Sequence, residues 1–543
     1  MQAQKGIATA DMIIIGKVHT IDDTNQVVEA VAISRNRVVA TGRKEEVLTL
    51  KSPHTIVIDA GHRTVMPGIY DSHNHIPTAG ILMDGVMLFD AKSISDMQEM
   101  VAQRAQEAPA GEWIQGGGWI ESQFRENRLP TRYDLDAAAP DHPVILGRLF
   151  GMSLVNSRAL ELAGIDRLTP NPHRGIIDRD QDGEPTGILR SNAVQLVSRL
   201  IADPEKRETL EKTKERILRA GTEYQRWGIT SAIDPGVPPL SARAYQELWQ
   251  QGQLPLRVNM MPAWHGMSSD IDRDLNALGV FSGFGDAWLS LGAVKMAIDG
   301  GLGSRTALLN WPFTDNTFSA EPLRLDINRL EEYFEQVHTR GWSVGIHCCG
   351  DKAQDLSCQA FHAVNQRHGR HDTVHNIIHA YFATEESLDM MVENNIAASV
   401  QPGFIFVEGD IYFDSVEEER LRGFKPLRTY LERGILVAAN SDMTSAHYNP
   451  FLGMRACLDR KTARGRVLGT EESISRTEML RLFTINGAKL AFEEGSKGSL
   501  AIGKLADIII LSDDIMSVDT QAVGELHVQL TLLDGKIVHR HEI

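Results

Sequence analysis

Short apolar runs alternate with longer amphipathic stretches through the central part of the chain. The apolar runs are rich in β-branched residues and bounded by glycine, proline or polar residues, a pattern that predicts strands separated by helices. Eight strands are predicted: one that ends at residue 73, and others at 229–234, 256–261, 289–298, 342–347, 376–379, 396–400 and 436–442. Strands that alternate with helices are typical of parallel α/β proteins, and eight such units predict a (β/α)8 TIM barrel over residues 66–489.

The two ends of the chain carry a different pattern, of short strands separated by turns. Strands are predicted at residues 12–16, 30–34, 37–40 and 55–59, and again at 506–511, 528–533 and 536–538. An Asp-Gly pair at 534–535 predicts a hairpin turn between the last two. Neither end makes a convincing domain alone, so we expect residues 1–65 and 490–543 to form one composite β-sandwich.

One connection in the predicted barrel is much longer than the others. About 150 residues separate the first strand from the second, far more than a barrel connection needs. The sequence therefore predicts an inserted subdomain at residues 80–200, with a helix near 95–106, a glycine-rich turn at 116–119 and a strand at 143–146. Because the insertion leaves from the end of the first strand, we expect it to roof the active site.

Charge and composition exclude several classes of partner. The chain has 543 residues and a formal net charge of −17, which disfavours nucleic acid or an anionic membrane surface as a partner. No apolar run is long enough for a membrane span or a signal-peptide core, so we expect a cytoplasmic protein. The four cysteines have no disulfide or metal-site spacing and are interpreted as core or pocket-wall thiols.

Side chains that can bind a metal gather at the ends of the predicted strands. His73 and His75 are two residues apart, so on a strand both imidazoles point to the same side. In a barrel, active sites form where several strands end, at their carboxyl ends. A single histidine at a strand end is more often a packing residue, and only the combined pattern argues for a site. The candidate metal ligands are His73, His75, Lys295, His347, His379 and Asp442.

Lys295 is unusual because it lies within an apolar run, where a buried ammonium is costly. A lysine kept neutral by burial can act as a nucleophile or form a Schiff base. It can also react with carbon dioxide to give a carbamate, a group that can bridge two metal ions. The residues alone leave these alternatives open.

Several motifs along the chain resemble the amidohydrolase superfamily, and more closely the YtcJ-like branch (amidohydrolase family 3) that includes N-substituted formamide deformylases. The order His-x-His, Lys, His, His, Asp along the predicted strands is similar to the superfamily's metal site. The supporting segments are 66–75 (MPGIYDSHNH), 116–119 (GGGW), 154–160 (LVNSRAL), 299–307 (DGGLGSRTA), 347–353 (HCCGDKA), 441–442 (SD) and 498–509 (GSLAIGKLADII). Met152 and Ile378 stand where family members often have His and Glu.

The resemblance implies metal-dependent hydrolysis of a carbon–nitrogen bond. One or two Zn2+ ions, or another divalent metal, would be held by the six candidate ligands, with a carbamylated Lys295 as the bridge if two are bound. Asp442 would take a proton from the attacking water and pass it to the leaving nitrogen, and the metal or a neutral His379 would polarise the carbonyl group.

The substrate is expected to be a small molecule with an aryl or alkyl group beside a small acyl group. Trp119, Met152 and Phe404 are candidate apolar walls, and Asp299 and Arg305 candidate polar contacts. For the last two, a salt bridge within the loop is an equally good interpretation. An N-substituted formamide fits this description, and so does an arylurea, a carbamate or an N-acyl compound.

Three other functions remain open at this point. Another hydrolase of the same superfamily, acting on N-acyl amino acids or cyclic amides, would have similar ligands. A non-catalytic amidohydrolase-like scaffold should have lost ligands, and a Schiff-base lyase would use Lys295 but leave the histidines unexplained. The chain is expected to bind no nucleic acid and no membrane, and a homodimer is possible from its size and the resemblance.

Overall fold

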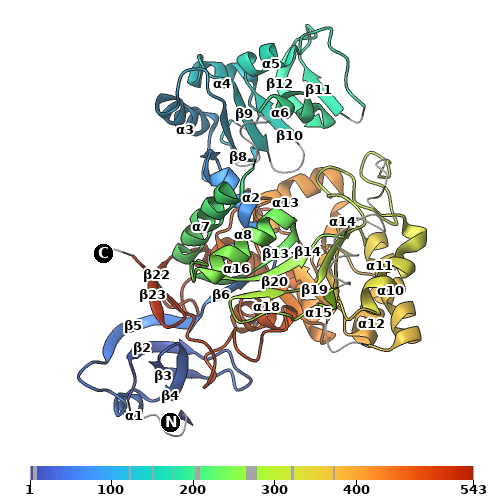
Figure 1. Ribbon diagram of the computed structural model, residues 1–543. Helices are drawn as coiled ribbons and strands as arrows, with labels where there is room; N and C mark the ends of the chain where they lie inside the picture. The colour runs from blue at the N-terminus through green and yellow to red at the C-terminus, as the bar shows by residue number, and fades with distance from the viewer. Residues whose placement is uncertain are drawn as a thin grey trace.

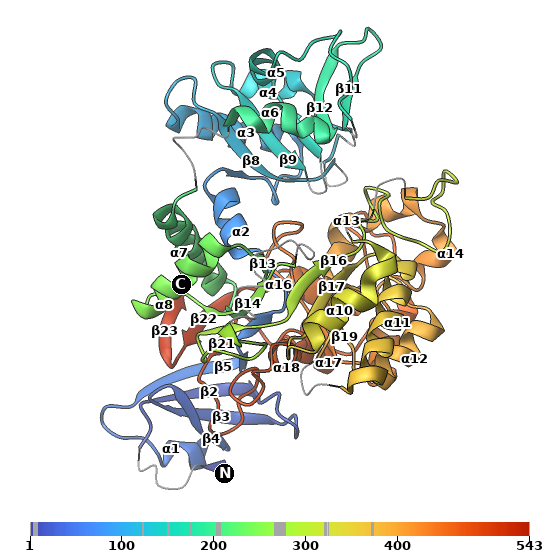
Figure 2. The same ribbon diagram turned by 45° about the vertical axis from the view of Figure 1, so that its right-hand side comes forward.

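The computed structural model describes residues 2–3, 9–121, 124–126, 128–148, 152–173, 175–201, 208–264, 278–319, 323, 325–370 and 374–541. Figure 1 shows three parts, one above the other: a sheet from both chain ends at the bottom, a central α/β body, and the inserted segment at the top. Figure 2 shows that α2 (Ile76–Met83) and α7 (Leu210–Arg226) lead into and out of the insertion.

The central body is built on parallel strands in two sheets. One sheet has the order β15 (Leu289–Leu291), β14 (Arg257–Pro262), β13 (Ile229–Val237) and β6 (Ile69–Asp71). The other has the order β16 (Val294–Ala297), β17 (Val344–Cys348), β18 (Asn376–His379), β19 (Ala397–Val400) and β20 (Val437–Ala439). All eight predicted strands are present, and the one predicted at 289–298 is divided into β15 and β16.

The two sheets contact each other at two places. On one side, Ala263, directly after β14, forms a parallel bridge with Lys295 of β16. On the other side, the backbone N–H of Ser72, directly after β6, donates to the carbonyl oxygen of Ala439 in β20, at 3.3 Å. The carboxyl ends of strands from both sheets are thereby brought together.

Helices follow most of these strands. The helices are α7, α8 (Pro239–Gln250), α10 (Leu330–His338), α11 (Asp351–His368), α12 (Glu385–Asn394), α13 (Gly403–Ser415), α15 (Leu427–Glu432) and α16 (Pro450–Asp459). In α7 the buried residues Ile217, Ala220 and Tyr224 recur every three or four positions, so one face packs inward. The sequence predicts this helix over about residues 204–227, of which 204–207 lie outside the described residues. In the described part of the chain, the model contains no helix with both the length and the apolarity of a membrane span.

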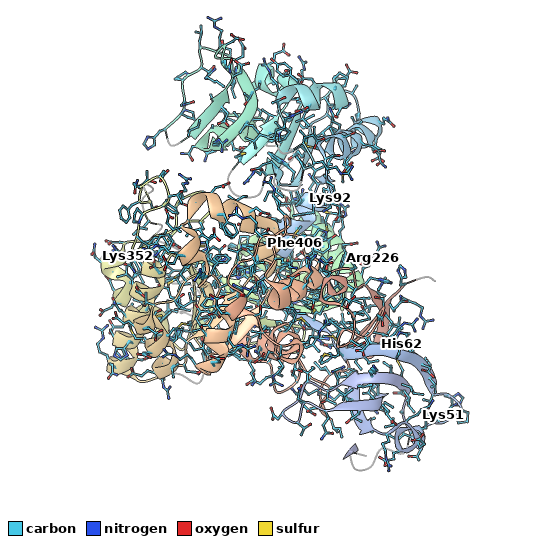
Figure 3. All side chains as sticks on the ribbon, turned by 180° about the vertical axis from the view of Figure 1, so that it is seen from behind. Lys51, His62, Lys92, Arg226, Lys352 and Phe406 are labelled. Atoms are coloured by element: carbon cyan, nitrogen blue, oxygen red, sulfur yellow. The ribbon has the colours of Figure 1, made fainter. Side chains whose placement is uncertain are left out.

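Both chain ends contribute to one eight-stranded sheet, with the order β1-β4-β3-β2-β5-β21-β22-β23. Its members are β1 (Gln2–Ala3), β2 (Met12–His19), β3 (Val27–Ser34), β4 (Arg37–Gly42), β5 (Ile56–Pro67), β21 (Ile508–Leu511), β22 (Val528–Leu533) and β23 (Lys536–Arg540). Strand β5 pairs with β2 on one side and β21 on the other, which joins the two ends of the chain. Figure 3 shows Lys51 and His62 in this part, and Lys92 at the base of the insertion.

The insertion has a separate hydrophobic core and a six-stranded sheet of its own, with the order β11 (Gly175–Arg179), β12 (Pro185–Ser191), β10 (Met152–Val155), β9 (Val144–Arg148), β8 (Ile114–Trp119) and β7 (Val86–Met87). The predicted helix is present as α3 (Ile94–Glu107) and the predicted strand as β9 (Val144–Arg148). The turn predicted at residues 116–119 is wrong, because these residues belong to strand β8 (Ile114–Trp119). A Cβ atom at Gly116 would lie 2.3 Å from the carbonyl oxygen of Val86, so this glycine permits close strand packing.

A buried ion pair joins the terminal sheet to the central body. Arg257 of β14 is 1% exposed, and its guanidinium contacts Asp507 at 2.7 Å and Asp534 at 3.0 Å. We expect Arg257→Met to leave two carboxylates unpaired and to destabilise the fold by about 3–5 kcal/mol, seen as a lower melting temperature in calorimetry.

The matched control is Arg158→Met, which removes an exposed pair with Glu161 and should cost at most about 1 kcal/mol. Equal melting temperatures for the two variants would contradict this role for Arg257.

Candidate metal centre

Five of the six predicted ligands lie in two groups of metal-binding side chains at the carboxyl ends of the strands. The first group is His73, His75 and Asp442, and the second is His347, Cys349 and His379. Within each group the possible ligand atoms all lie within 4.8 Å of one another. The sixth predicted ligand, Lys295, approaches the first group, with its Nζ atom 3.5 Å from His73 Nε2.

In the first group, one carboxylate oxygen faces both imidazoles. Asp442 Oδ1 lies 3.7 Å from His73 Nε2 and 3.5 Å from His75 Nε2. His73 is buried, whereas the His75 side chain is 36% exposed, so the group is reached from one side. The buried Nδ1 of His73 has no hydrogen-bond partner among the described residues.

Backbone and side-chain hydrogen bonds fix this group. Asp71, at the end of β6, accepts from the Ser441 backbone N–H at 3.0 Å, from Ser441 Oγ at 2.6 Å and from Asn74 Nδ2 at 2.9 Å. The backbone N–H of Asp442 donates to the carbonyl oxygen of His73 at 2.9 Å. Burial raises the pKa of Asp71 above its ordinary value, against the effect of these donors. The segment with both histidines is thus joined to the loop that carries Asp442.

The second group comes from the neighbouring strands β17 and β18. The rings of His347 and His379 are 4.2 Å apart between centroids, and Cys349 Sγ lies 3.5 Å from His347 Nε2. His347 Nε2 also lies 3.6 Å from Asp299 Oδ1. His379 has a φ of 78°, a left-handed conformation that is strained for a histidine and is kept here by its surroundings.

Gln401 and Lys425 form a hydrogen-bonded chain behind His379. Gln401 Oε1 lies 2.9 Å from His379 Nδ1 and accepts from Lys425 Nζ at 3.1 Å, while Gln401 Nε2 donates to Asn440 at 3.0 Å. An oxygen acceptor at Nδ1 keeps the proton on that nitrogen and leaves Nε2 of His379 free for a metal ion. Burial lowers the pKa of Lys425 to about 7, and its ammonium lies 4.0 Å from the Tyr381 ring centre.

The electrostatics of the two groups suit metal ligation. Burial lowers the pKa of His73 well below its ordinary value, and Lys295 and the other histidines lower it further. Burial has the same effect on the pKa of His379, together with His347 and Lys295. Both imidazoles are therefore neutral near pH 7, the form that binds a metal ion. Neutral imidazoles, a carboxylate and a thiol are donors that fit zinc.

The other predicted site residues lie elsewhere or support the loops. Trp119 is fully buried in the core of the insertion, where its Nε1 donates to the carbonyl oxygen of Leu146, so its ring is not available as a pocket wall. Met152 belongs to the same core. Phe404, in α13, is buried with its ring centre 5.2 Å from Lys425 Nζ.

The two polar candidates in the 299–307 loop make structural contacts. Asp299 accepts from the backbone N–H groups of Cys349 at 3.0 Å, Gly350 at 2.8 Å and Leu308 at 2.9 Å, which fixes the turn between β17 and α11. Arg305 pairs with Asp315 and donates to the carbonyl oxygen of Asp414 at 3.2 Å. For Arg305 the structure agrees with the salt-bridge interpretation.

Sequence reasoning missed three residues beside the histidines. Gln401 directly follows strand β19, so the strand-end rule that found the ligands could have found it. Cys349 is two residues after His347 and shares its side of the strand end, the same spacing as His73 and His75. Lys425 lies in a loop, and no local pattern distinguishes it from a surface lysine.

Comparison with known proteins defines the class. The solved structure of a metal-dependent hydrolase from Pyrococcus horikoshii OT3 is similar to this chain, with a TM-score of 0.72 and 26% identity over 94% of this chain and 99% of that one. Residues 56–539 match the amidohydrolase family, and the chain belongs to it. It is therefore a hydrolase that acts on carbon–nitrogen bonds.

Two relatives are similar over nearly their whole length. The protein YtcJ of Bacillus subtilis (strain 168) is 29% identical over 533 residues, which cover 96% of this chain and 98% of YtcJ. The N-substituted formamide deformylase of Arthrobacter pascens is 28% identical over 542 residues, which cover 96% of this chain and 97% of that enzyme. The resemblance deduced from the motifs is confirmed.

Gln401→Ala tests the orientation of His379. The substitution removes the acceptor at Nδ1 and should lower metal affinity by about 10–100-fold, because such supporting hydrogen bonds hold the ligand ring and its tautomer. Competition with a chromophoric chelator measures this affinity. Gln359→Ala, which changes an exposed glutamine bonded to Glu386, is the control and should leave it unchanged. Wild-type affinity in Gln401→Ala would exclude the proposed orientation.

Proposed function

We propose that this protein is a metal-dependent hydrolase that cleaves the carbon–nitrogen bond of a small N-acyl compound, with an N-substituted formamide as the first candidate. One observation carries the proposal: two groups of metal-binding side chains share one end of the strands, with Lys295 close to the first. His73, His75 and Asp442 would hold a metal ion on one side, and His347 and His379 on the other. A carbamate formed on Lys295 would bridge two ions.

The chain's own residues supply the proton transfers. A zinc ion bound here would make a water molecule acidic enough to attack near neutral pH and would polarise the substrate carbonyl. Asp442 Oδ2 lies 4.0 Å from His379 Nδ1, so this carboxylate lies between the two groups. Asp442 would accept a proton from the attacking water and deliver it to the nitrogen, so that an amine leaves and formate is released.

The substrate assignment rests on similarity across the whole chain. The relative from Arthrobacter pascens is named for deformylation of N-substituted formamides, and its similarity extends over 96% of this chain. A formyl group is the smallest acyl group, which suits a centre where six side chains approach one another closely.

A (β/α)8 barrel is the architecture that best explains the two parallel sheets. The contacts between Ala263 and Lys295 and between Ser72 and Ala439 support closure of the strands into one barrel. We propose residues 66–489 as the barrel domain, residues 80–200 as an insertion over the active site, and residues 1–65 with 490–543 as the composite sandwich.

An assay with N-alkyl and N-aryl formamides tests the function. Zinc-loaded protein should release formate and amine in equal amounts, which formate dehydrogenase coupling and amine derivatisation measure. The matching N-acetyl amines are the control for the size of the acyl group and should react more slowly. Turnover of N-acyl amino acids, with none of the formamides, would replace the proposed substrate by the alternative within the family.

Asp442→Asn separates catalysis from folding. The amide keeps the shape of the side chain but cannot accept the proton, so kcat should fall by about 10²–10⁴-fold, with an unchanged melting temperature. Steady-state kinetics and metal content are measured together, because Asp442 is also a ligand. Asp389→Asn, at an exposed position in α12, is the control. A kcat within twofold of wild type would exclude Asp442 as the base.

A further inference from the structure

Two adjacent cysteines at the end of β17 lie in different surroundings. Cys348 Sγ points into the core, 3.3 Å from Ser357 Oγ and 3.6 Å from the carbonyl oxygen of Ala353. Cys349 Sγ instead lies 3.5 Å from His347 Nε2 and belongs to the second ligand group. Consecutive residues at the end of a strand point to opposite sides. The thiol of Cys349 therefore points towards the histidines, and the thiol of Cys348 points away from them.

We propose that Cys349 is a metal ligand, so that the second group binds its ion through two imidazole nitrogens and one thiolate sulfur. This inference rests on the proposed function, which needs only the histidines, Lys295 and Asp442. It assigns a donor that the family resemblance does not supply and that the strand-end pattern alone did not single out.

The spacing of the donor atoms supports this assignment. In a tetrahedral zinc site, Zn–S and Zn–N bonds of about 2.3 Å and 2.1 Å place the sulfur about 3.6 Å from each nitrogen. The observed distance from Cys349 Sγ to His347 Nε2 is 3.5 Å. His379 completes the group within 4.8 Å.

The protein's own contacts fix the position of the thiol. The backbone N–H of Cys349 donates to Asp299 Oδ1 at 3.0 Å, and Cys349 is only 2% exposed. Its thiol also hydrogen-bonds with the Tyr381 hydroxyl, which helps to hold its orientation. A preorganised donor of this kind costs little side-chain entropy when the ion arrives.

Binding through sulfur has a defined chemistry. The S–H bond breaks, the proton leaves to solvent, and the sulfur keeps the electron pair with which it binds the ion. Thiolate favours softer divalent ions, so the second group should prefer zinc to magnesium or manganese.

X-ray absorption at the zinc edge of the zinc-loaded full-length protein tests the proposal without measuring activity. We expect a sulfur shell at about 2.3 Å in the wild-type protein, lost in Cys349→Ser. Cys348→Ser is the matched control and should keep the shell, because its sulfur points into the core. Absence of the shell in wild-type protein, or its persistence in Cys349→Ser, would overturn the assignment.

The wild-type spectrum decides the question even if a variant does not fold. Zinc binding and formamide hydrolysis with only nitrogen and oxygen neighbours would overturn the role of Cys349 and leave the proposed function intact. Protein that binds no zinc would overturn both.

Discussion

The hydrogen bonds of Asp71 are the constraint on which the rest of the centre depends. This carboxylate accepts from Ser441 and Asn74, while the Asp442 N–H donates to the carbonyl of His73, so the ends of the first and last parallel strands are joined. His73 and Asp442 are far apart in the sequence, and these hydrogen bonds hold the two segments that carry them side by side. The order of the strands and the buried carboxylate of Asp71 therefore bring the first ligand group together.

The opposite group is organised in the same way, by a buried carboxylate and a buried amide. Asp299 collects three backbone N–H groups at the turn after β17, and Gln401 orients His379 from behind. Residues outside the ligand set thus determine which nitrogen or sulfur faces the centre. The buried imidazoles beside Lys295 are uncharged, so their nitrogen atoms carry free lone pairs. A metal cation that binds these lone pairs stabilises the arrangement.

Much of the metal centre could be predicted from the sequence, because metal-binding side chains recur at the ends of the predicted strands. His73, His75, His347, His379 and Asp442 were found from strand period and position, and the structure brings them together. The pocket residues were not predictable in this way. Trp119 has the aromatic character of a pocket wall, but whether a ring faces a pocket or the core of the insertion depends on tertiary packing. The glycines at 116–118 suggested a turn, although close strand packing requires them.

Metal content of protein purified without chelators tests the central claim most directly. Plasma mass spectrometry should find about one or two divalent ions per chain, zinc foremost, with less in both His73→Ala and His347→Ala, since each variant removes a ligand from a different group. A loss confined to His73→Ala would indicate that the first group alone binds metal. Wild-type protein that is folded but free of metal, and that takes up none from zinc solution, would contradict the account.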